Sequence, residues 1–118
     1  MRLKLNRPIC FFDLETTGAK VGKDRIVEIA ILRVDIDKTE SQKVWRINPE
    51  MEISYQAIQV HGITNEMVKS EPNFAYYSNE IHQFIKGCDL SGFNAIKFDI
   101  PILVEEFIRA GTEFDFTQ

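Results

Sequence analysis

The sequence predicts a mixed α/β fold, in which helices pack against one β-sheet. Three strand-like apolar segments come first and are joined by short polar turns. The apolar spacing then becomes helical, and one further strand-like segment separates two helical patterns. At 118 residues, the chain has the length of one domain with a core of its own. We therefore expect residues 1–118 to form a single domain.

The three leading segments predict an antiparallel meander. Residues 8–14 contain the apolar run Ile9-Cys10-Phe11-Phe12, which predicts a short central strand that is buried on both faces. Residues 25–35 and 42–47 are rich in Ile and Val or alternate in polarity, as strands do. Polar turn residues separate the three segments, and such short links favour hairpin connections.

Helical patterns follow the meander. Residues 55–60 and 64–69 predict two short helices, the second with Thr64 as its N-cap. Asn73 predicts the start of a longer helix that ends at Lys86-Gly87. Its apolar residues recur at helical spacing: Phe74, Tyr77, Ile81, Phe84 and Ile85.

A strand and a helix complete the predicted order of elements. Residues 88–91 predict a brief strand, and residues 92–94 a turn. Residues 98–110 predict a helix that ends before Gly111. Pro101 fits the first turn of that helix, where a missing N–H leaves no hydrogen bond unmade.

Composition narrows the class of protein. The formal net charge of −4 argues against binding nucleic acid through a broad basic surface, although an enzyme that brings divalent cations to its substrate can have an acidic pocket. Cys10 and Cys88 each lie in an apolar stretch, which predicts buried reduced thiols. No segment has the length of a signal peptide's apolar region or of a membrane span. We expect a cytoplasmic protein with no membrane partner.

Asp13 and Glu15 predict a cation site at the end of the first strand. Side chains two residues apart leave the same face of a strand, and their like charges repel. Hard oxygen ligands of this kind suit Mg²⁺ or Mn²⁺. Thr16, Thr17 and Gly18 follow, with hydroxyl groups and a glycine that lets the backbone approach a ligand. The alternative is that both acids are solvated or ion-paired at a sheet edge.

Asp99 is a third candidate acid. It lies at the start of the helix predicted at residues 98–110, where the helix dipole favours the anionic form that a metal ligand requires. The alternative is that Asp99 only caps this helix.

These residues resemble a known family. The run from Phe12 to Gly18 is similar to the first motif of the DnaQ-like, DEDD-type 3′–5′ exonucleases, the family of the proofreading epsilon subunit of bacterial DNA polymerase III. The run from Gly92 to Asp99 resembles the second motif, and His61-Gly62-Ile63-Thr64 resembles a segment that contacts the terminal nucleotide. The resemblance implies an RNase H-like fold with a five-stranded mixed sheet.

The resemblance also implies roles for individual residues. Asp13, Glu15 and Asp99 would be catalytic and would bind two divalent cations, Mg²⁺ or Mn²⁺. The implied reaction is hydrolysis at a single-stranded 3′ end of DNA or RNA that releases nucleoside monophosphates, and a DNA polymerase is an implied partner. The implied substrate-binding residues are Leu14, Thr16, Thr17, Gly18, His61, Asn94 and Phe98.

The sequence departs from the family's pattern after Asp99. The resemblance favours the DEDDh subclass, but the third motif that decides the subclass, His-x-Ala-x-x-Asp or Tyr-x-x-x-Asp, is absent, and both His61 and His82 precede Asp99. We therefore expect the sequence to be truncated at its C-terminal end, without the last strand and helix. We also expect weak or no activity, and self-association through exposed apolar surface.

Two other classes of function remain open. A nucleic-acid-binding module with the same fold would need no metal, whereas an exonuclease should lose metal uptake in the variant Asp13→Ala. An interaction domain would use these acids only for folding or solubility. In that case the variants Asp13→Ala and Asp99→Ala would leave metal and nucleotide affinity unchanged.

Overall fold

A four-stranded mixed sheet forms the centre of the fold. The computed structural model describes residues 6–92 and 98–112. Strands β1 (Ile9–Thr16), β2 (Ile26–Val34) and β3 (Glu40–Arg46) pair antiparallel, and β4 (Asp89–Gly92) pairs parallel with β1. The order across the sheet is β3-β2-β1-β4, so β1 is a central strand. The predicted meander, with a later strand added to it, is confirmed.

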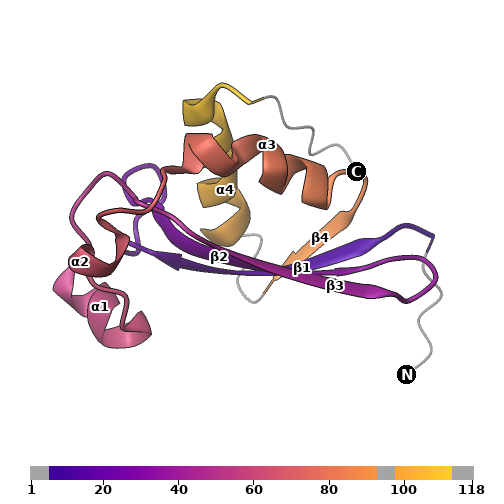
Figure 1. The fold of residues 1–118 in the computed structure, drawn as a ribbon, viewed down its shortest axis with the longest axis horizontal. Helices are drawn as coiled ribbons and strands as arrows, with labels where there is room; N and C mark the ends of the chain where they lie inside the picture. The colour runs from indigo at the N-terminus through magenta and orange to yellow at the C-terminus, as the bar shows by residue number, and fades with distance from the viewer. Residues whose placement is uncertain (1–5, 93–97, 113–118) are drawn as a thin grey trace.

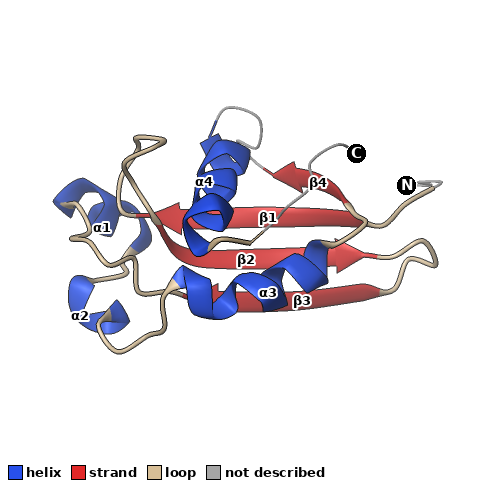
Figure 2. Ribbon diagram, turned by 90° about the horizontal axis from the view of Figure 1, so that it is seen from above, coloured by secondary structure: helices blue, strands red, loops and turns tan. Residues whose placement is uncertain are grey.

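The helices occupy two places relative to the sheet. Helices α3 (Phe74–Ile85) and α4 (Ile100–Ala110) lie across one of its faces (Figure 1). The short helices α1 (Tyr55–His61) and α2 (Asn65–Val68) lie beyond the end of the sheet at which β1 ends and β2 begins (Figure 2). The order of helices and the class of fold are as predicted. No helix within residues 6–92 and 98–112 has the length and apolar character to cross a bilayer.

Side-chain caps start three of these helices. Ser54 Oγ accepts a hydrogen bond from the Ala57 N–H at 3.1 Å, and Asn73 Oδ1 accepts one from the Tyr76 N–H at 3.0 Å. Thr64 Oγ1 caps α2 in the same way through the Met67 N–H. These bonds satisfy amides that the first turn of a helix leaves without a partner. The predicted N-caps Thr64 and Asn73 are confirmed.

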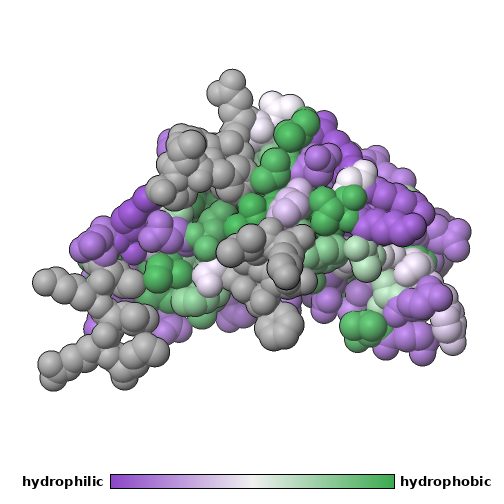
Figure 3. Space-filling view, turned by 180° about the vertical axis from the view of Figure 1, so that it is seen from behind, coloured by the Kyte–Doolittle hydropathy of each residue, from purple (hydrophilic) through white to green (hydrophobic). Residues whose placement is uncertain are grey.

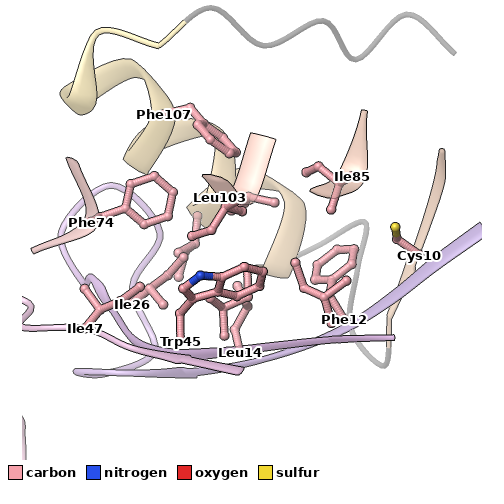
Figure 4. Packing of buried hydrophobic residues seen from close by; sticks show 14 of the residues in the cluster. Cys10, Phe12, Leu14, Ile26, Trp45, Ile47, Phe74, Ile85, Leu103 and Phe107 are labelled. Atoms are coloured by element: carbon pink, nitrogen blue, oxygen red, sulfur yellow. The ribbon is translucent and has the colours of Figure 1, made fainter. Parts of the chain in front are cut away.

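The core lies between the sheet and helices α3 and α4. Figure 4 shows Phe12 and Leu14 of β1 pointing toward Leu103 and Phe107 of α4. The rings of Phe74 and Phe107 meet edge to face, with centroids 5.1 Å apart. Full burial of such a side chain is worth roughly 1.5–3 kcal/mol, so this layer holds α3 and α4 on the sheet. Both cysteines are free and buried, as predicted, and burial raises the pKa of the Cys10 thiol.

The two faces of β1 have different surroundings. Cys10, Phe12 and Leu14 are buried in the core, whereas Asp13 is exposed and Phe11 is 41% exposed. The prediction that this strand is buried on both faces is therefore wrong for the described residues, because α3 and α4 cover only one face. Phe11 and Asp13 line a hollow on the other face together with Ala30, Leu32, Gln42 and Ser91. Self-association through this face stays a prediction.

Apolar surface is also present along the side of the molecule that carries β4 and α4. Figure 3 shows hydrophobic residues in a band across the middle of this side, with hydrophilic residues around them.

Candidate active site

Asp13 and Glu15 lie on the face of β1 that is turned away from the core. Burial alternates along the strand, so the core receives Cys10, Phe12 and Leu14, and the acids between and after them face outward. Asp13 is exposed and Glu15 is partly buried. The predicted placement of the two carboxylates on one face is confirmed. The strand itself runs on to Thr16, so the acids lie within β1 and not at its very end.

Negative charge is concentrated around Glu15. Its cross-strand neighbour on β2 is Glu28, whose carboxylate is paired with Arg46 of β3 at 2.8 Å. Burial raises the pKa of the Glu15 carboxyl above its ordinary value. The charges of Asp13 and Glu28 raise this pKa further. A cation bound beside Asp13 and Glu15 would relieve this repulsion, so the two carboxylates fit a hard divalent ion as ligands.

Asp99 is buried at the N-terminus of α4. It is 5% exposed, its backbone has helical dihedral angles, and its side chain makes no cap hydrogen bond. The Asp99 side chain therefore does not cap the helix through a hydrogen bond. Within the described part of the chain, no three His, Cys, Asp or Glu side chains are grouped closely enough to hold a metal ion. Asp13 and Glu15 share one face of β1. A metal site that they share with Asp99 stays a prediction.

A pocket opens next to Glu15. It is lined by the end of β1 and by α1, which lie at the same end of the fold (Figure 1). Its volume is about 350 Å³. Three separate parts of the sequence line it: the end of β1 with the turn after it, helix α1, and the start of α4. The lining residues are Leu14, Glu15, Thr16, Gly18, Ala19, Ser54, Gln56, Ala57, Val60, His61 and Phe98.

Most of the predicted substrate-binding residues therefore share one pocket. Leu14, Thr16, Gly18, His61 and Phe98 all line it, although they come from distant parts of the sequence. The exceptions are Thr17, which does not line it, and Asn94, which lies outside the described residues.

His61 connects α1 to the end of β1. Its Nδ1 accepts a hydrogen bond from the Ile63 N–H at 3.0 Å, so the proton of the neutral ring must be on Nε2. The Nε2–H donates to the Thr16 carbonyl oxygen at 3.0 Å. Both ring nitrogens are therefore used within the protein, and His61 fixes the wall of the pocket at Thr16.

Asp24 stabilises the turn after β1 through two hydrogen bonds. Thr17 is 1% exposed, and its hydroxyl donates to Asp24 Oδ1 at 2.9 Å; the other oxygen, Oδ2, accepts from the Lys20 N–H at 2.8 Å. A Cβ at Gly18 would lie 2.6 Å from Asp24 Oδ2. Glycine is therefore required at this position because the Asp24 carboxylate packs against it. The Thr17 side chain is bonded within the turn and does not line the pocket.

The sequence interpretation missed several residues of this site. Gln56, Ala57 and Val60 line the pocket with His61, and their spacing places them on one face of a helix. That periodicity could have been read from the sequence once His61 was singled out. Asp24, by contrast, contacts Gly18 and Thr17 through a loop whose path no local pattern specifies.

The comparisons with known proteins agree with this geometry. The exonuclease family model named RNase_T matches residues 10–114. DNA polymerase III subunit epsilon of Treponema pallidum is 34% identical over 95 residues, which are 80% of this chain and 44% of the relative. The 3′–5′ exonuclease DinG of Bacillus subtilis is 32% identical over 100 residues, which are 84% of this chain and 11% of the relative.

A solved structure shows the same fold. The crystal structure of E. coli exonuclease I with a dT13 oligonucleotide superposes with a TM-score of 0.80 at 23% identity. It covers 90% of this chain and 24% of that protein. The fold is therefore RNase H-like, as the sequence resemblance implied, and the chain spans less than half the length of these relatives. With the family model matched over most of its length, the chain belongs to the DnaQ-like 3′–5′ exonuclease family.

Proposed function

We propose that this chain forms one exonuclease domain of the kind that hydrolyses phosphodiester bonds at the 3′ end of DNA or RNA to nucleoside monophosphates, and that residues 1–118 by themselves have weak or no activity because they lack the third motif. The observation that carries the proposal is the pocket beside Glu15. Residues of the first motif, His61 and Phe98 of the second motif all line it. The name of the DinG relative, 3′–5′ exonuclease, supports this direction of digestion.

The pocket walls suit a terminal nucleoside. Val60 is 84% exposed and, with Ala57, presents an apolar surface from α1, while Phe98 offers an aromatic face on the side of α4. Leu14, Thr16 and Gly18 would hold the terminal sugar and its 3′-OH. Thr16 Oγ1 donates to the Gly18 carbonyl at 2.7 Å, which leaves the lone pairs of this hydroxyl able to accept a further bond.

Asp13, Glu15 and Asp99 would hold two divalent cations, Mg²⁺ or Mn²⁺. Support comes from the crowded negative charge at Glu15 and from the burial of Asp99 at the start of α4. When bound, such ions lower the pKa of an attacking water and stabilise the leaving 3′ oxygen. The protein's own part is to hold the strand end: His61 fixes the Thr16 carbonyl, and Asp24 fixes the turn at Gly18.

The substrate and partner of this chain can be proposed from the same relatives. The exonuclease I structure contains a single-stranded oligonucleotide, and the epsilon relative is by name a subunit of DNA polymerase III. We propose a single-stranded 3′ end as the substrate and a DNA polymerase as a partner.

One observation favours a second candidate, a nucleic-acid-binding module without catalysis. The described residues place no third acid with Asp13 and Glu15 in a metal-binding group. Such a module would bind a nucleotide without any requirement for divalent metal.

Calorimetric titration of the protein with Mn²⁺, and then with thymidine 5′-monophosphate, separates the two candidates. We expect the unaltered chain to bind Mn²⁺ and to bind the nucleotide more tightly when Mn²⁺ is present. The variant Glu15→Gln should lose at least about tenfold in Mn²⁺ affinity because it removes a charged ligand. The control Glu40→Gln, an exposed acid on β3, should bind like the unaltered chain. Nucleotide binding that is independent of Mn²⁺ would favour the module and overturn the exonuclease proposal.

A further inference from the structure

Glu106 is a buried carboxylate to which the reaction gives no role. It lies on α4 and is 0% exposed. Its Oε1 accepts hydrogen bonds from Arg25 Nε at 3.1 Å and from an Arg25 terminal nitrogen at 2.6 Å. Its Oε2 accepts from the backbone N–H of Ile26 at 2.8 Å. A single side chain of α4 is thus bonded to both the side chain and the backbone at the start of β2.

Arg25 carries this connection on to the turn after β1. Its backbone N–H donates to Thr17 Oγ1 at 3.0 Å, and its carbonyl accepts from the Thr17 N–H at 2.9 Å. Thr17 lies between Thr16 and Gly18, both of which line the pocket. A continuous set of polar bonds therefore joins α4 to the pocket wall formed by the turn.

Helix α4 also leads to a second wall of the pocket, the one that contains Phe98. Phe98 lines the pocket and lies two residues before α4, the helix that carries Glu106. Ile102, Leu103 and Phe107 pack α4 against the sheet, but apolar contacts have no preferred direction and tolerate small shifts along it. Two nitrogens of the Arg25 guanidinium donate to Glu106 Oε1 while Oε2 accepts from the Ile26 N–H, and these directional bonds can set that position.

We propose that Glu106 and Arg25 are positioning residues that set the distance between the two walls of the nucleotide pocket. The inference rests on the proposed function and goes beyond it, since neither residue lines the pocket. A buried ion pair is weak evidence of a stabilising role, because apolar residues of the same size often stabilise a fold equally well. Apolar residues in their place would not fix the position of α4 relative to the turn.

The experiment measures the affinity of thymidine 5′-monophosphate at saturating Mn²⁺ in the variant Glu106→Gln. Glutamine keeps the volume of the side chain and an oxygen for the Ile26 N–H, but it loses the charged bond to Arg25. We expect about tenfold weaker binding of the nucleotide, a typical effect of removing a residue that orients a site. The titration is done well below the unfolding temperature, with near-ultraviolet circular dichroism to establish that the variant is folded.

Two further variants complete the test. Glu105→Gln alters the neighbouring carboxylate, which pairs with Arg109 at 4.0 Å. Arg109 also lies 3.8 Å from Glu106 Oε1, but the variant leaves the bonds of Glu106 to Arg25 and Ile26 intact, so nucleotide affinity should be unchanged. Arg25→Lys keeps the positive charge but replaces the two guanidinium donors with one ammonium group, and it should also weaken nucleotide binding. This variant serves in place of Glu106→Gln if Glu106→Gln does not fold. A folded Glu106→Gln or Arg25→Lys variant with unaltered affinity would overturn the inference. Failure of the unaltered chain to bind the nucleotide would instead overturn the proposed function.

Discussion

The substitution Gly18→Ala tests the contact that shapes the turn after β1. The new Cβ would lie 2.6 Å from Asp24 Oδ2 and 2.8 Å from Asp24 Cγ, where ordinary contacts begin at 3.4 Å. Gly18 is not among the glycines with positive φ, so alanine meets no backbone penalty there. The predicted loss of stability therefore comes from the Asp24 carboxylate alone.

The size of the effect follows from the bonds that the carboxylate must give up. To restore normal contact it must move by about 0.8 Å, which would stretch at least one of its bonds, at 2.9 Å to Thr17 and 2.8 Å to Lys20, beyond hydrogen-bond range. A bond to a charged group is worth about 1.5–3 kcal/mol. The reduced freedom of the unfolded chain returns about 0.4–1 kcal/mol. We expect a net loss of about 0.5–2.5 kcal/mol in the free energy of unfolding.

Urea denaturation in two backgrounds measures this contact directly. In the variant Asp24→Ala the clashing atoms are absent, so adding Gly18→Ala should cost nothing or stabilise the fold slightly. Gly22→Ala is the control: its φ is +88° and nothing lies within 4 Å, so its cost of about 1 kcal/mol should be the same in both backgrounds. An equal cost of Gly18→Ala with and without Asp24 would refute the contact.

Three further predictions concern charge, burial and capping. Because the pKa of Glu15 is raised in the fold, its ionisation opposes folding as the pH rises; Glu15→Gln should therefore unfold at a higher temperature than the unaltered chain at pH 7, with no such advantage at pH 4 in thermal scans. Glu106→Ala should lower the free energy of unfolding by about 3 kcal/mol in urea, because it removes the acceptor of the Ile26 N–H and the nearer of the two carboxylates that pair with the partly buried Arg25 side chain. Asn73→Ala should lower the free energy of unfolding by about 1 kcal/mol, because it removes the side-chain cap of α3. A loss no larger than that of an alanine substitution at an exposed, uncapped position would contradict this.

The secondary structure followed from local patterns in the sequence. Asn73 precedes a helix whose apolar residues recur at helical spacing, and both features act within a few residues of each other. The β1–β2–β3 meander is equally local, because its turns are short. The burial pattern of β1 could not be predicted from local sequence. Phe11 and Phe12 are the same residue type, and only the position of α3 and α4 on one face of the sheet decides which of them is buried.

The candidate site was predicted only in part. Asp13 and Glu15 could be placed on one face from strand geometry, and the family resemblance located the walls that meet at the pocket. Asp24 and Glu106 could not be found in this way. Each is an acid in a charged stretch of sequence, and only its tertiary contacts, with Gly18 in one case and Arg25 in the other, separate it from a solvated carboxylate.

The most direct test of the proposed function is to locate Mn²⁺ on the protein. In a two-dimensional NMR spectrum of the ¹⁵N-labelled chain, substoichiometric Mn²⁺ broadens the signals of the amides nearest to it. We expect the amides from Asp13 to Gly18 and those at the start of α4 to broaden first, and the variant Glu15→Gln to abolish this effect. Broadening that is spread over surface acids such as Asp37, or that is unchanged in Glu15→Gln, would contradict a metal site at the end of β1.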